Sequence, residues 1–337
     1  MSPDTARPAP ARPHDRLAAW LADDMAAVND LIAGRMASRH APRIPEVTAH
    51  LIEAGGKRLR PLLALAAARL FETDLEGRHI RLAATVEFIH TATLLHDDVV
   101  DESARRRGRP TANLLWDNKS SVLVGDYLFA RAFQLSVETG NLRILDILAE
   151  ASATLAEGEV LQLTAAGDLS TTEAVYLQIV RGKTAALFAA ATEGGAVAAG
   201  AGADHAAALR NYGDALGIAF QMVDDFLDYG GAGDGIGKDI GDDFREGKIT
   251  LPVIRALAAA DEDERAFWKR CIGRGQQQDG DLERALAILA RHGALAATRT
   301  AALEWVARAK TSLAGLPEHP LRDMLADLAD YVVERVV

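Results

Sequence analysis

Apolar residues recur every three or four positions along most of the chain from Arg16 onward, which is the spacing of one face of an α-helix. The pattern is plainest in segments 17–36, 282–316 and 321–337, where leucine and alanine dominate. Glycine pairs and isolated prolines interrupt it, and no run of alternating β-branched residues competes with it. The pattern predicts a single all-α domain, a large bundle of about ten or more helices around a central cavity.

Composition indicates where the predicted domain begins and whether any part of it crosses a membrane. Residues 1–15 are rich in proline, alanine and arginine and lack the apolar core of a signal peptide, so we expect a disordered tail there and one helical domain over 16–337. The most apolar stretch, 185–203, is rich in alanine and glycine and contains Glu193, which suits a buried helix better than a membrane span. We therefore expect a protein without a transmembrane segment.

The net charge and the cysteine content restrict the binding partners and the cellular compartment that we expect. The net charge of −11 argues against nucleic acid as the general partner. The single cysteine, Cys271, excludes an intramolecular disulfide, fits a reducing cytoplasm and is expected to be an ordinary packed thiol.

A group of carboxylates stands at the end of a mostly apolar helical run. Asp97, Asp98 and Asp101 all fall on one side of this helix at about 100° per residue. Glu87 and His90 fall on the same side. A largely polar stripe on an otherwise apolar helix indicates a candidate site.

A second triad with the same spacing occurs at Asp224, Asp225 and Asp228, with Gln221 on the same face. For a single motif of this kind, a solvated helix end is as good an interpretation as a functional site. Two copies on apolar helices favour one shared site. Six unpaired carboxylates in one cavity would repel by several kcal/mol even at an effective dielectric constant of about 20, so a cation is expected between them. Oxygen ligands without a histidine or cysteine cluster indicate Mg²⁺, which binds carboxylates together with substrate phosphates and water.

Basic residues supply the opposite charge. Lys57 and Arg60 follow Gly55-Gly56 and share a face if a helix starts there, where they are suited to phosphate oxygens. The alternative is a solvated basic helix start, which the helix dipole disfavours unless an anion is bound. The spacing of a Walker loop is absent, so diphosphate binding is expected through side chains and metal ions. Further cations are Arg105, Arg106 and Arg107 after the first triad, and Lys183, Lys238 and Lys248, each next to a glycine.

Five motifs, in this order and across almost the whole predicted domain, resemble those of the trans-polyprenyl diphosphate synthase family. They are GGKRLRP (55–61), HDDVVDESARRRGRPTAN (96–113), GKTAALF (182–188), FQMVDDFLDYGG (220–231) and GKDIGDDFREGKITLP (237–252). The resemblance implies an all-helical fold of the isoprenoid synthase type and a homodimer. It also implies three Mg²⁺ ions per active site and head-to-tail condensation of isopentenyl diphosphate onto an allylic diphosphate.

The same resemblance assigns roles to individual residues. The Mg²⁺ ions that grip the allylic diphosphate would be held by Asp97, Asp98, Asp101, Asp224, Asp225 and Asp228. The same diphosphate would be bound by Arg106, Lys183 and Lys238, with Lys248 as a helper. Isopentenyl diphosphate would be bound by Lys57, Arg60, His90 and Arg107. The space where the carbocation forms would be lined by Thr184 and Gln221, and the departing diphosphate would take the proton.

Two further groups of residues near the motifs have a structural alternative. His96 precedes Asp97 but lies about 100° around the helix, so a packing role is favoured over metal ligation. Asp239, Asp242 and Asp243 either extend the metal site or, as we favour, are solvated loop charges.

Chain length is the last property that the family resemblance addresses. Ala92 and Thr93 lie one to two turns before the first triad, where short-chain members of the family often carry an aromatic residue. An open tunnel favours the octaprenyl to decaprenyl diphosphate synthases, which supply quinone side chains such as that of ubiquinone, with farnesyl diphosphate as the primer. The alternatives are a geranylgeranyl or other shorter-chain synthase, a terpene cyclase, and an inactive regulatory subunit. Release of so apolar a product is expected to involve loose membrane association.

Overall fold

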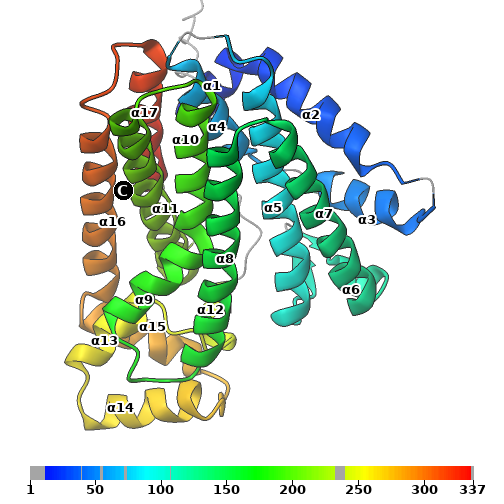
Figure 1. Cartoon of the computed structure of the whole chain (residues 1–337). Helices are drawn as coiled ribbons and strands as arrows, with labels where there is room; N and C mark the ends of the chain where they lie inside the picture. The colour runs from blue at the N-terminus through cyan, green and yellow to red at the C-terminus, as the bar shows by residue number, and fades with distance from the viewer. Residues whose placement is uncertain are drawn as a thin grey trace, which may run out of the picture.

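Helices form nearly all of the regular structure in the computed structural model, which describes residues 12–38, 40–53, 56–71, 74–106, 108–231 and 240–334. The predicted all-α fold is confirmed (Figure 1). The elements are α1 (Pro13–Trp20), α2 (Ala22–Met36), α3 (Arg43–Glu53), α4 (Leu59–Arg69), α5 (Arg78–Val100), β1 (Arg105–Arg106), β2 (Arg109–Pro110), α6 (Ala112–Leu115), α7 (Asn118–Glu138), α8 (Leu142–Ala165), α9 (Glu173–Val180), η1 (Arg181–Ala185), α10 (Ala186–Ala198), α11 (Ala203–Gly230), α12 (Asp242–Arg245), α13 (Leu251–Ala259), α14 (Glu262–Trp268), η2 (Lys269–Gly273), α15 (Asp281–Arg291), α16 (Ala294–Ser312) and α17 (Pro320–Glu334).

The first helix begins earlier than the sequence indicated. Proline stands at its first position, Pro13, three residues before the expected start of the domain at residue 16. Proline is well tolerated there because the first amides of a helix have no partner within the helix. The remainder of the expected tail, residues 1–11, lies outside the described residues.

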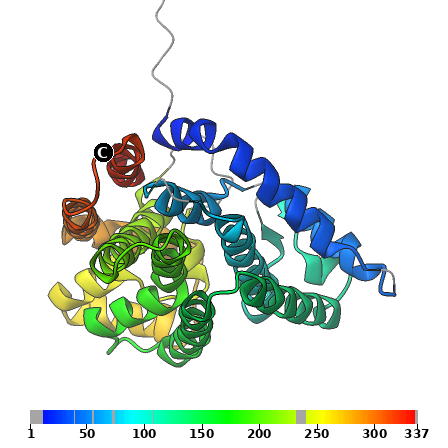
Figure 2. The same ribbon diagram turned by 45° about the horizontal axis from the view of Figure 1, so that its top comes forward.

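Small residues let the central helices approach closely. Helix α10 is almost entirely buried and packs against α4, α8 and α11 (Figures 1 and 2). A Cβ added at Gly195 would lie 2.5 Å from the Ala64 carbonyl oxygen of α4, and one added at Gly213 would lie 2.6 Å from the Phe188 carbonyl oxygen of α10. The alanine- and glycine-rich stretch is thus a buried core helix, as predicted. Its Glu193 reaches Arg143 on α8 with a 2.8 Å ion pair.

The helices that carry the two triads end on the same side of the bundle. Both α5 and α11 run down into the lower half of the molecule in Figure 1, where α9, α12 and α13 lie. This arrangement brings Asp97 and Asp224, which are 127 residues apart in the sequence, to the same side of the bundle.

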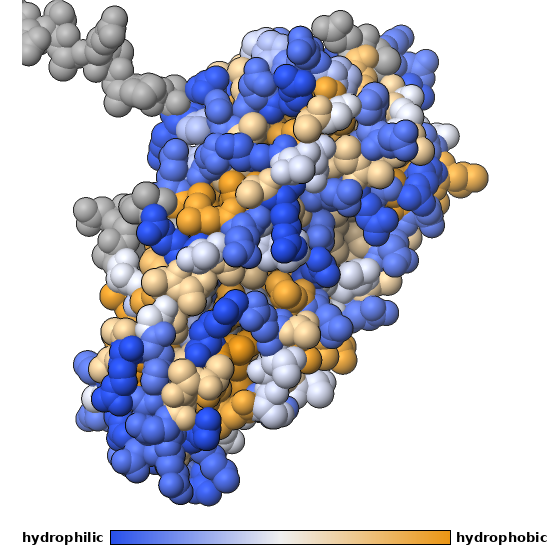
Figure 3. Space-filling model, turned by 90° about the vertical axis from the view of Figure 1, so that its left-hand side faces the viewer, coloured by the Kyte–Doolittle hydropathy of each residue, from blue (hydrophilic) through white to orange (hydrophobic). Residues whose placement is uncertain are grey.

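The side that carries α16 and α14 is mostly hydrophilic with small hydrophobic patches (Figure 3). Over the part of the chain that the structure describes, no helix is both long and apolar enough to cross a membrane.

Candidate active site

The first triad lies at the C-terminal end of α5. Asp101 is the residue that caps the helix, and Asp98 is fully buried. Asp98 accepts a 2.8 Å hydrogen bond from Nε of Arg106, which lies on the two-stranded hairpin β1–β2, and its main-chain carbonyl accepts one from Asn113 at 3.2 Å. The hairpin therefore folds back over the helix end. Burial raises the pKa of Asp98, and Arg106 partly offsets that rise.

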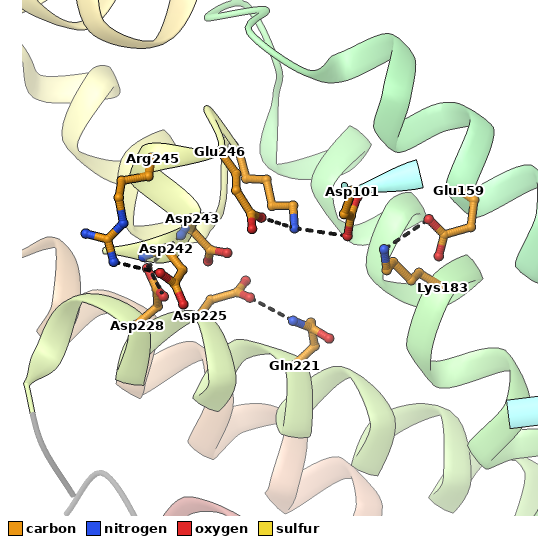
Figure 4. A network of polar contacts seen from close by, with 11 residues as sticks. Asp101, Glu159, Lys183, Gln221, Asp225, Asp228, Asp242, Asp243, Arg245 and Glu246 are labelled. Atoms are coloured by element: carbon orange, nitrogen blue, oxygen red, sulfur yellow. Dashed lines mark hydrogen bonds and ion pairs between the residues drawn. The ribbon is translucent and has the colours of Figure 1, made fainter. Parts of the chain in front are cut away.

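Asp97 lies close to a cation on another helix. Burial raises the pKa of Asp97 to about 6, while Lys183 opposes this shift and Glu159 adds to it. Lys183 forms a 3.0 Å ion pair with Glu159 of α8 (Figure 4). The sequence reasoning missed Glu159, because a half-buried glutamate on a long helix gives no signal of its own.

The segment that carries Lys183 is a π-helical turn, η1, between α9 and α10. Glycine precedes the lysine because α8 passes close by: a Cβ on Gly182 would lie 2.7 Å from Cα of Gly158. A Cβ on Gly158 would in turn lie 2.7 Å from the main-chain nitrogen of Lys183. Single π-helical turns often occur at functional sites. Here the turn and the two glycines bring Lys183 and Thr184 to the two triads.

The second triad lies in the last two turns of α11. Asp225 is almost fully buried and accepts hydrogen bonds from the Tyr176 hydroxyl at 2.5 Å and the Gln221 amide at 2.9 Å. The Thr184 hydroxyl donates to the Gln221 carbonyl oxygen at 2.9 Å. Burial raises the pKa of Asp225 to about 7, although both donors lower it. The pKa of Tyr176 is raised well above its ordinary value, first by burial and then by Asp225. The structure thus brings Thr184 and Gln221 together with Asp225 and adds Tyr176.

The third carboxylate of this triad holds the turn α12. The main-chain amides of Asp242 and Asp243 donate to the two oxygens of Asp228 at 3.2 and 3.1 Å. The side chain of Asp242 pairs with Arg245 at 2.6 Å. Thus Asp242 is balanced by a neighbouring arginine, as the loop-charge interpretation expected, and the main chain of both residues contacts the triad.

Lys248 lies between the carboxylates of Asp101, in the first triad, and Glu246. Its Nζ is 3.6 Å from Oδ2 of Asp101 and 2.5 Å from Oε2 of Glu246 (Figure 4). Burial lowers the pKa of Lys248, but Asp101 and Glu246 more than reverse that effect, so the net pKa is raised and the side chain stays charged. This ammonium group therefore provides part of the positive charge that six carboxylates were predicted to need.

The basic residues before the first triad lie around the start of α4. This helix begins at Leu59, so the condition under which Lys57 and Arg60 would share a helix face is not met: Lys57 precedes the helix and is exposed. The reason is Arg58, whose positive φ of 49° keeps the preceding residues out of the helix. Arg58 forms an ion pair with Glu87 of α5.

Arg60 lies in the first turn of α4 and faces α5. A nitrogen of its guanidinium group is 3.2 Å from Nε2 of His90, and the group lies 4.5 Å from the ring centroid of Phe188. Arg60 and His90, two of the residues expected to bind isopentenyl diphosphate, are thus neighbours.

Two small residues were expected to shape the tunnel. Ala92 is fully buried in the main core cluster. Thr93 is half-buried, and its hydroxyl donates to the His90 carbonyl oxygen at 2.8 Å. His96 packs between α5 and α7, with Nε2 3.1 Å from the Val122 carbonyl oxygen, and its ring would collide with a Cβ at Gly125. The packing role predicted for His96 is confirmed.

Three residues from the sequence interpretation, Arg107, Lys238 and Asp239, lie outside the described residues. Within the described ranges, no three histidine, cysteine or acidic side chains converge closely enough to hold a metal ion by themselves. The donors at the two triads are carboxylate oxygens, the type that Mg²⁺ prefers, and this ion usually takes one or two carboxylates alongside phosphate oxygens and water. The residues present therefore fit Mg²⁺ bound together with a diphosphate.

Comparison with known proteins identifies the family. The family model described as Polyprenyl synthetase matches residues 41–289. The chain is 44% identical over 317 residues to the all-trans-nonaprenyl-diphosphate synthase (geranyl-diphosphate specific) of Rhodobacter capsulatus, which covers 94% of this chain and 96% of that protein.

Solved structures agree with this family match. The crystal structure of a decaprenyl diphosphate synthase from Rhodobacter capsulatus is 70% identical, with a TM-score of 0.92 over 96% of this chain and 99% of that chain. A polyprenyl synthase from Caulobacter crescentus CB15, solved with calcium and isoprenyl diphosphate, is 53% identical, with a TM-score of 0.91 over 97% of this chain and 99% of that chain. The family predicted from the five motifs is confirmed. The chain belongs to the polyprenyl synthetase family and is a trans-prenyltransferase of the polyprenyl diphosphate synthase type.

Proposed function

We propose that this enzyme uses Mg²⁺ to condense isopentenyl diphosphate head-to-tail with an allylic diphosphate, expected to be farnesyl diphosphate, and makes a long all-trans polyprenyl diphosphate for quinone side chains. The observation that carries the proposal is a pair of lysines at the first triad, on the side of the bundle where the second triad also lies. Lys183 opposes the rise in the pKa of Asp97, and Nζ of Lys248 is 3.6 Å from Asp101. Both lysines are positioned to exchange a carboxylate partner for diphosphate oxygens.

The carboxylates of both triads are assigned to Mg²⁺ by the family motifs. One oxygen of Asp98 accepts a hydrogen bond from Arg106, Asp225 accepts hydrogen bonds from Tyr176 and Gln221, and Asp228 accepts them from the amides of α12. These contacts orient three of the six proposed metal ligands, Asp97, Asp98, Asp101, Asp224, Asp225 and Asp228. Bound Mg²⁺ would supply charge stabilisation to the leaving diphosphate. Three ions per site remain our expectation.

The cations around the triads give the leaving group its remaining charge partners. Ionisation of the allylic C–O bond leaves a delocalised cation and a diphosphate, so stabilisation is most effective at the diphosphate oxygens. Lys183, Arg106 and Lys248 would hold those oxygens. The departing diphosphate then takes the proton that the product loses, beside Thr184 and Gln221. The family motifs alone assign Lys238 to the same diphosphate and Arg107 to isopentenyl diphosphate.

The second substrate would bind on the α4 side. Arg60 and His90 are neighbours there, and the Arg58–Glu87 ion pair fixes the main chain between Lys57 and Arg60. A diphosphate held by Lys57, Arg60 and His90 would present the double bond of isopentenyl diphosphate toward the site of ionisation. The ring of Phe188 packs against the Arg60 guanidinium and orients it.

The product would be long because α5 carries small side chains where a plug would stand. Ala92 contributes only a methyl group, and Thr93 turns its hydroxyl back to its own helix. A close-packed interior admits another isoprene unit only where no bulky ring blocks it. The relatives named nonaprenyl and decaprenyl diphosphate synthase support the same length class.

The product profile tests this proposal. Purified enzyme is incubated with Mg²⁺, labelled isopentenyl diphosphate and either geranyl or farnesyl diphosphate, and the dephosphorylated products are sized by chromatography. We expect chains of about eight to ten isoprene units. A stop at four units would mean that a residue deeper than Ala92 and Thr93 forms the tunnel floor, and it would overturn the quinone role while the prenyltransferase assignment stands. Cyclic hydrocarbons formed without isopentenyl diphosphate would indicate a cyclase, and an inactive single chain would indicate a regulatory subunit.

We further propose a cytoplasmic homodimer, formed through α7 and α8. Exposed positions on α7 recur every three or four residues and include Leu123, Phe133 and Val137. Helix α8, which packs beside α7, has a stripe with the same spacing that includes Leu142 and Val160, whose exposed fractions are 83% and 63%. Its exposed positions are Leu142, Asp146, Ala149, Ala153, Ala156, Val160 and Leu163.

Two adjacent apolar stripes of this kind are typical of an interface between helices of a symmetric dimer. Sedimentation velocity tests it: we expect the wild-type chain to sediment as a dimer and the double variant Phe133→Glu, Leu142→Glu as a monomer. Leu303→Glu, at an exposed leucine on α16, is the matched control and should remain a dimer. A wild-type monomer at micromolar concentration would overturn the proposal.

A further inference from the structure

The short helix α12 is connected to both triads. Its first two amides donate to Asp228 of the second triad at 3.2 and 3.1 Å. Three residues beyond its end, Lys248 reaches Asp101 of the first triad, and the Lys248 amide donates to the Asp243 carbonyl oxygen at 2.9 Å. The position of α12 therefore sets the position of a carboxylate and of a cation at the same time.

A helix of four residues cannot hold itself in place by its own hydrogen bonds. The amides that follow α12 donate to its carbonyl groups, with Gly247 reaching the Phe244 carbonyl oxygen at 3.1 Å, but these bonds lie within the same turn and do not attach it to the rest of the bundle. The side-chain amide of Gln277 supplies a donor from outside: its Nε2 is 2.7 Å from the Phe244 carbonyl oxygen and 3.4 Å from that of Arg245. The side chain of Phe244 is buried beside the rings of Phe267 and Trp268, at centroid distances of 6.5 and 6.2 Å.

The loop that carries Gln277 is itself rigidly anchored. Arg270 makes two hydrogen bonds to the carboxylate of Asp281, at 2.8 and 2.7 Å, and a third to the Gln276 carbonyl oxygen at 2.7 Å. The Gln278 amide donates to the same carboxylate at 2.7 Å. Gln277 therefore extends from a fixed loop, and its amide can hold α12 in one orientation.

We propose that Gln277 is a positioning residue for the prenyl-transfer reaction, acting through the main chain of α12 on Asp228 and Lys248. The inference rests on the proposed function, in which these two residues serve the metal and allylic-diphosphate half of the site. Loss of the amide donor would leave the Phe244 and Arg245 carbonyl groups without this contact. The α12 turn would then sample other orientations, and both partners would lose their alignment.

Amide hydrogen exchange of the substrate-free protein tests whether Gln277 holds α12 in one orientation. Gln277→Met keeps the length of the side chain and removes the donor, while Gln277→Lys keeps an N–H donor. We expect the amides of Asp242 and Asp243 to exchange about five-fold faster in Gln277→Met and near the wild-type rate in Gln277→Lys. Gln276→Met is the matched control, because Gln276 is exposed and contacts Arg270 through its main chain.

Steady-state kinetics test whether the position of α12 affects the binding of the allylic diphosphate and Mg²⁺. We expect Gln277→Met to raise the KM for the allylic diphosphate and the half-saturating Mg²⁺ concentration about five-fold, because α12 serves that half of the site. The KM for isopentenyl diphosphate, whose proposed ligands lie near α4, should stay unchanged. Gln277→Lys should restore the allylic KM, and Gln276→Met should leave all three values unaltered.

Several outcomes separate failure of this inference from failure of the proposed function. Unchanged exchange at Asp242 and Asp243 in Gln277→Met, or an equal rise in the KM of both substrates, would overturn the positioning role. A wild-type enzyme without prenyltransferase activity would overturn the proposed function, yet the exchange result would still decide whether Gln277 holds α12. Gln277→Ser removes the amide without placing an apolar group at this half-exposed site, and it serves where Gln277→Met does not fold.

Discussion

The two acidic triads share a sequence pattern but differ in what surrounds them. In the first triad, the buried Asp98 is paired with the charged Arg106, and Asp101 with the charged Lys248. In the second, Asp225 accepts hydrogen bonds from the neutral Tyr176 and Gln221, and Asp228 accepts them from main-chain amides. Among the contacts of the described residues, two carboxylates of the first triad are neutralised by long cationic side chains, whereas Asp225 and Asp228 of the second are held by neutral donors.

This difference suggests a division of labour. Long cationic side chains can turn from a carboxylate to a diphosphate when the substrate arrives, so the first triad is suited to exchange its partners. A tyrosine and a glutamine on packed helices cannot leave without breaking the core around them. We infer that α11 provides a rigid platform, while the end of α5 and its hairpin adapt to the substrate.

The largest expected effect comes from the first aspartate of each triad. Asp97→Ala and Asp224→Ala each remove a carboxylate that we assign to Mg²⁺, so kcat should fall by about 10³-fold or more in both. Incorporation of labelled isopentenyl diphosphate measures the loss, and circular dichroism checks that the helical fold persists. The control is Asp330→Ala, which removes an exposed carboxylate of α17 that pairs with Lys310. It should retain wild-type activity. Full activity in either triad variant would contradict the assignment.

A smaller effect, on the free energy of unfolding, distinguishes Asp98 from Asp225, the middle aspartates of the two triads. Arg106→Gln leaves the buried Asp98 without its counter-charge, and we expect a loss of about 2 kcal/mol in the free energy of unfolding, because Arg106 itself is partly exposed. Tyr176→Phe removes one neutral donor from Asp225 and should cost about 1 kcal/mol. Urea unfolding of the metal-free proteins measures both. The added substitution Asp98→Asn should recover stability in Arg106→Gln, and a cycle without such coupling would show that the pair is not structural.

The fold and the positions of the triads could be predicted because they depend on local patterns. Helical periodicity and glycine breaks sufficed for the all-α fold, and the spacing of Asp97, Asp98 and Asp101 sufficed to place them on one side of α5. The family motifs also named the residues that the structure brings near the triads, including Lys183 and Lys248.

The partners of the carboxylates could not be predicted, because each comes from a distant element. Tyr176 lies 49 residues before Asp225, and a tyrosine on an apolar helix is typical of an ordinary core residue. Glu159 reaches Lys183 only because Gly158 and Gly182 allow two main chains to touch, and no single stretch of sequence records that contact. The start of α4 could not be placed because the positive φ of Arg58, a non-glycine residue, carries no compositional signal.

The pH dependence of stability offers another test of the rigid platform. Asp225 has a pKa of about 7 in the metal-free folded protein and an ordinary value near 3.8 when unfolded, so the folded state binds the extra proton between these values. Its contribution to stability is therefore complete below pH of about 4 and is lost as the pH rises through about 7. Relative to Asp225→Asn, which does not titrate, the wild-type protein should lose stability from pH 5 to pH 8 in urea unfolding. A constant difference across that range would contradict the buried environment of Asp225.

The smallest expected effect tests how far the neutral hydrogen-bond chain extends. Thr184→Val keeps the shape of the side chain and removes the hydroxyl that donates to the Gln221 carbonyl oxygen. The Gln221 amide still reaches Asp225, so only one neutral hydrogen bond is lost, and kcat should fall about three-fold with little change in either KM. Steady-state assays with each substrate varied in turn measure this. A loss as large as that of Asp224→Ala would show that Thr184 acts on the reacting atoms directly, and the second triad would then be less of a passive platform than its neutral partners imply.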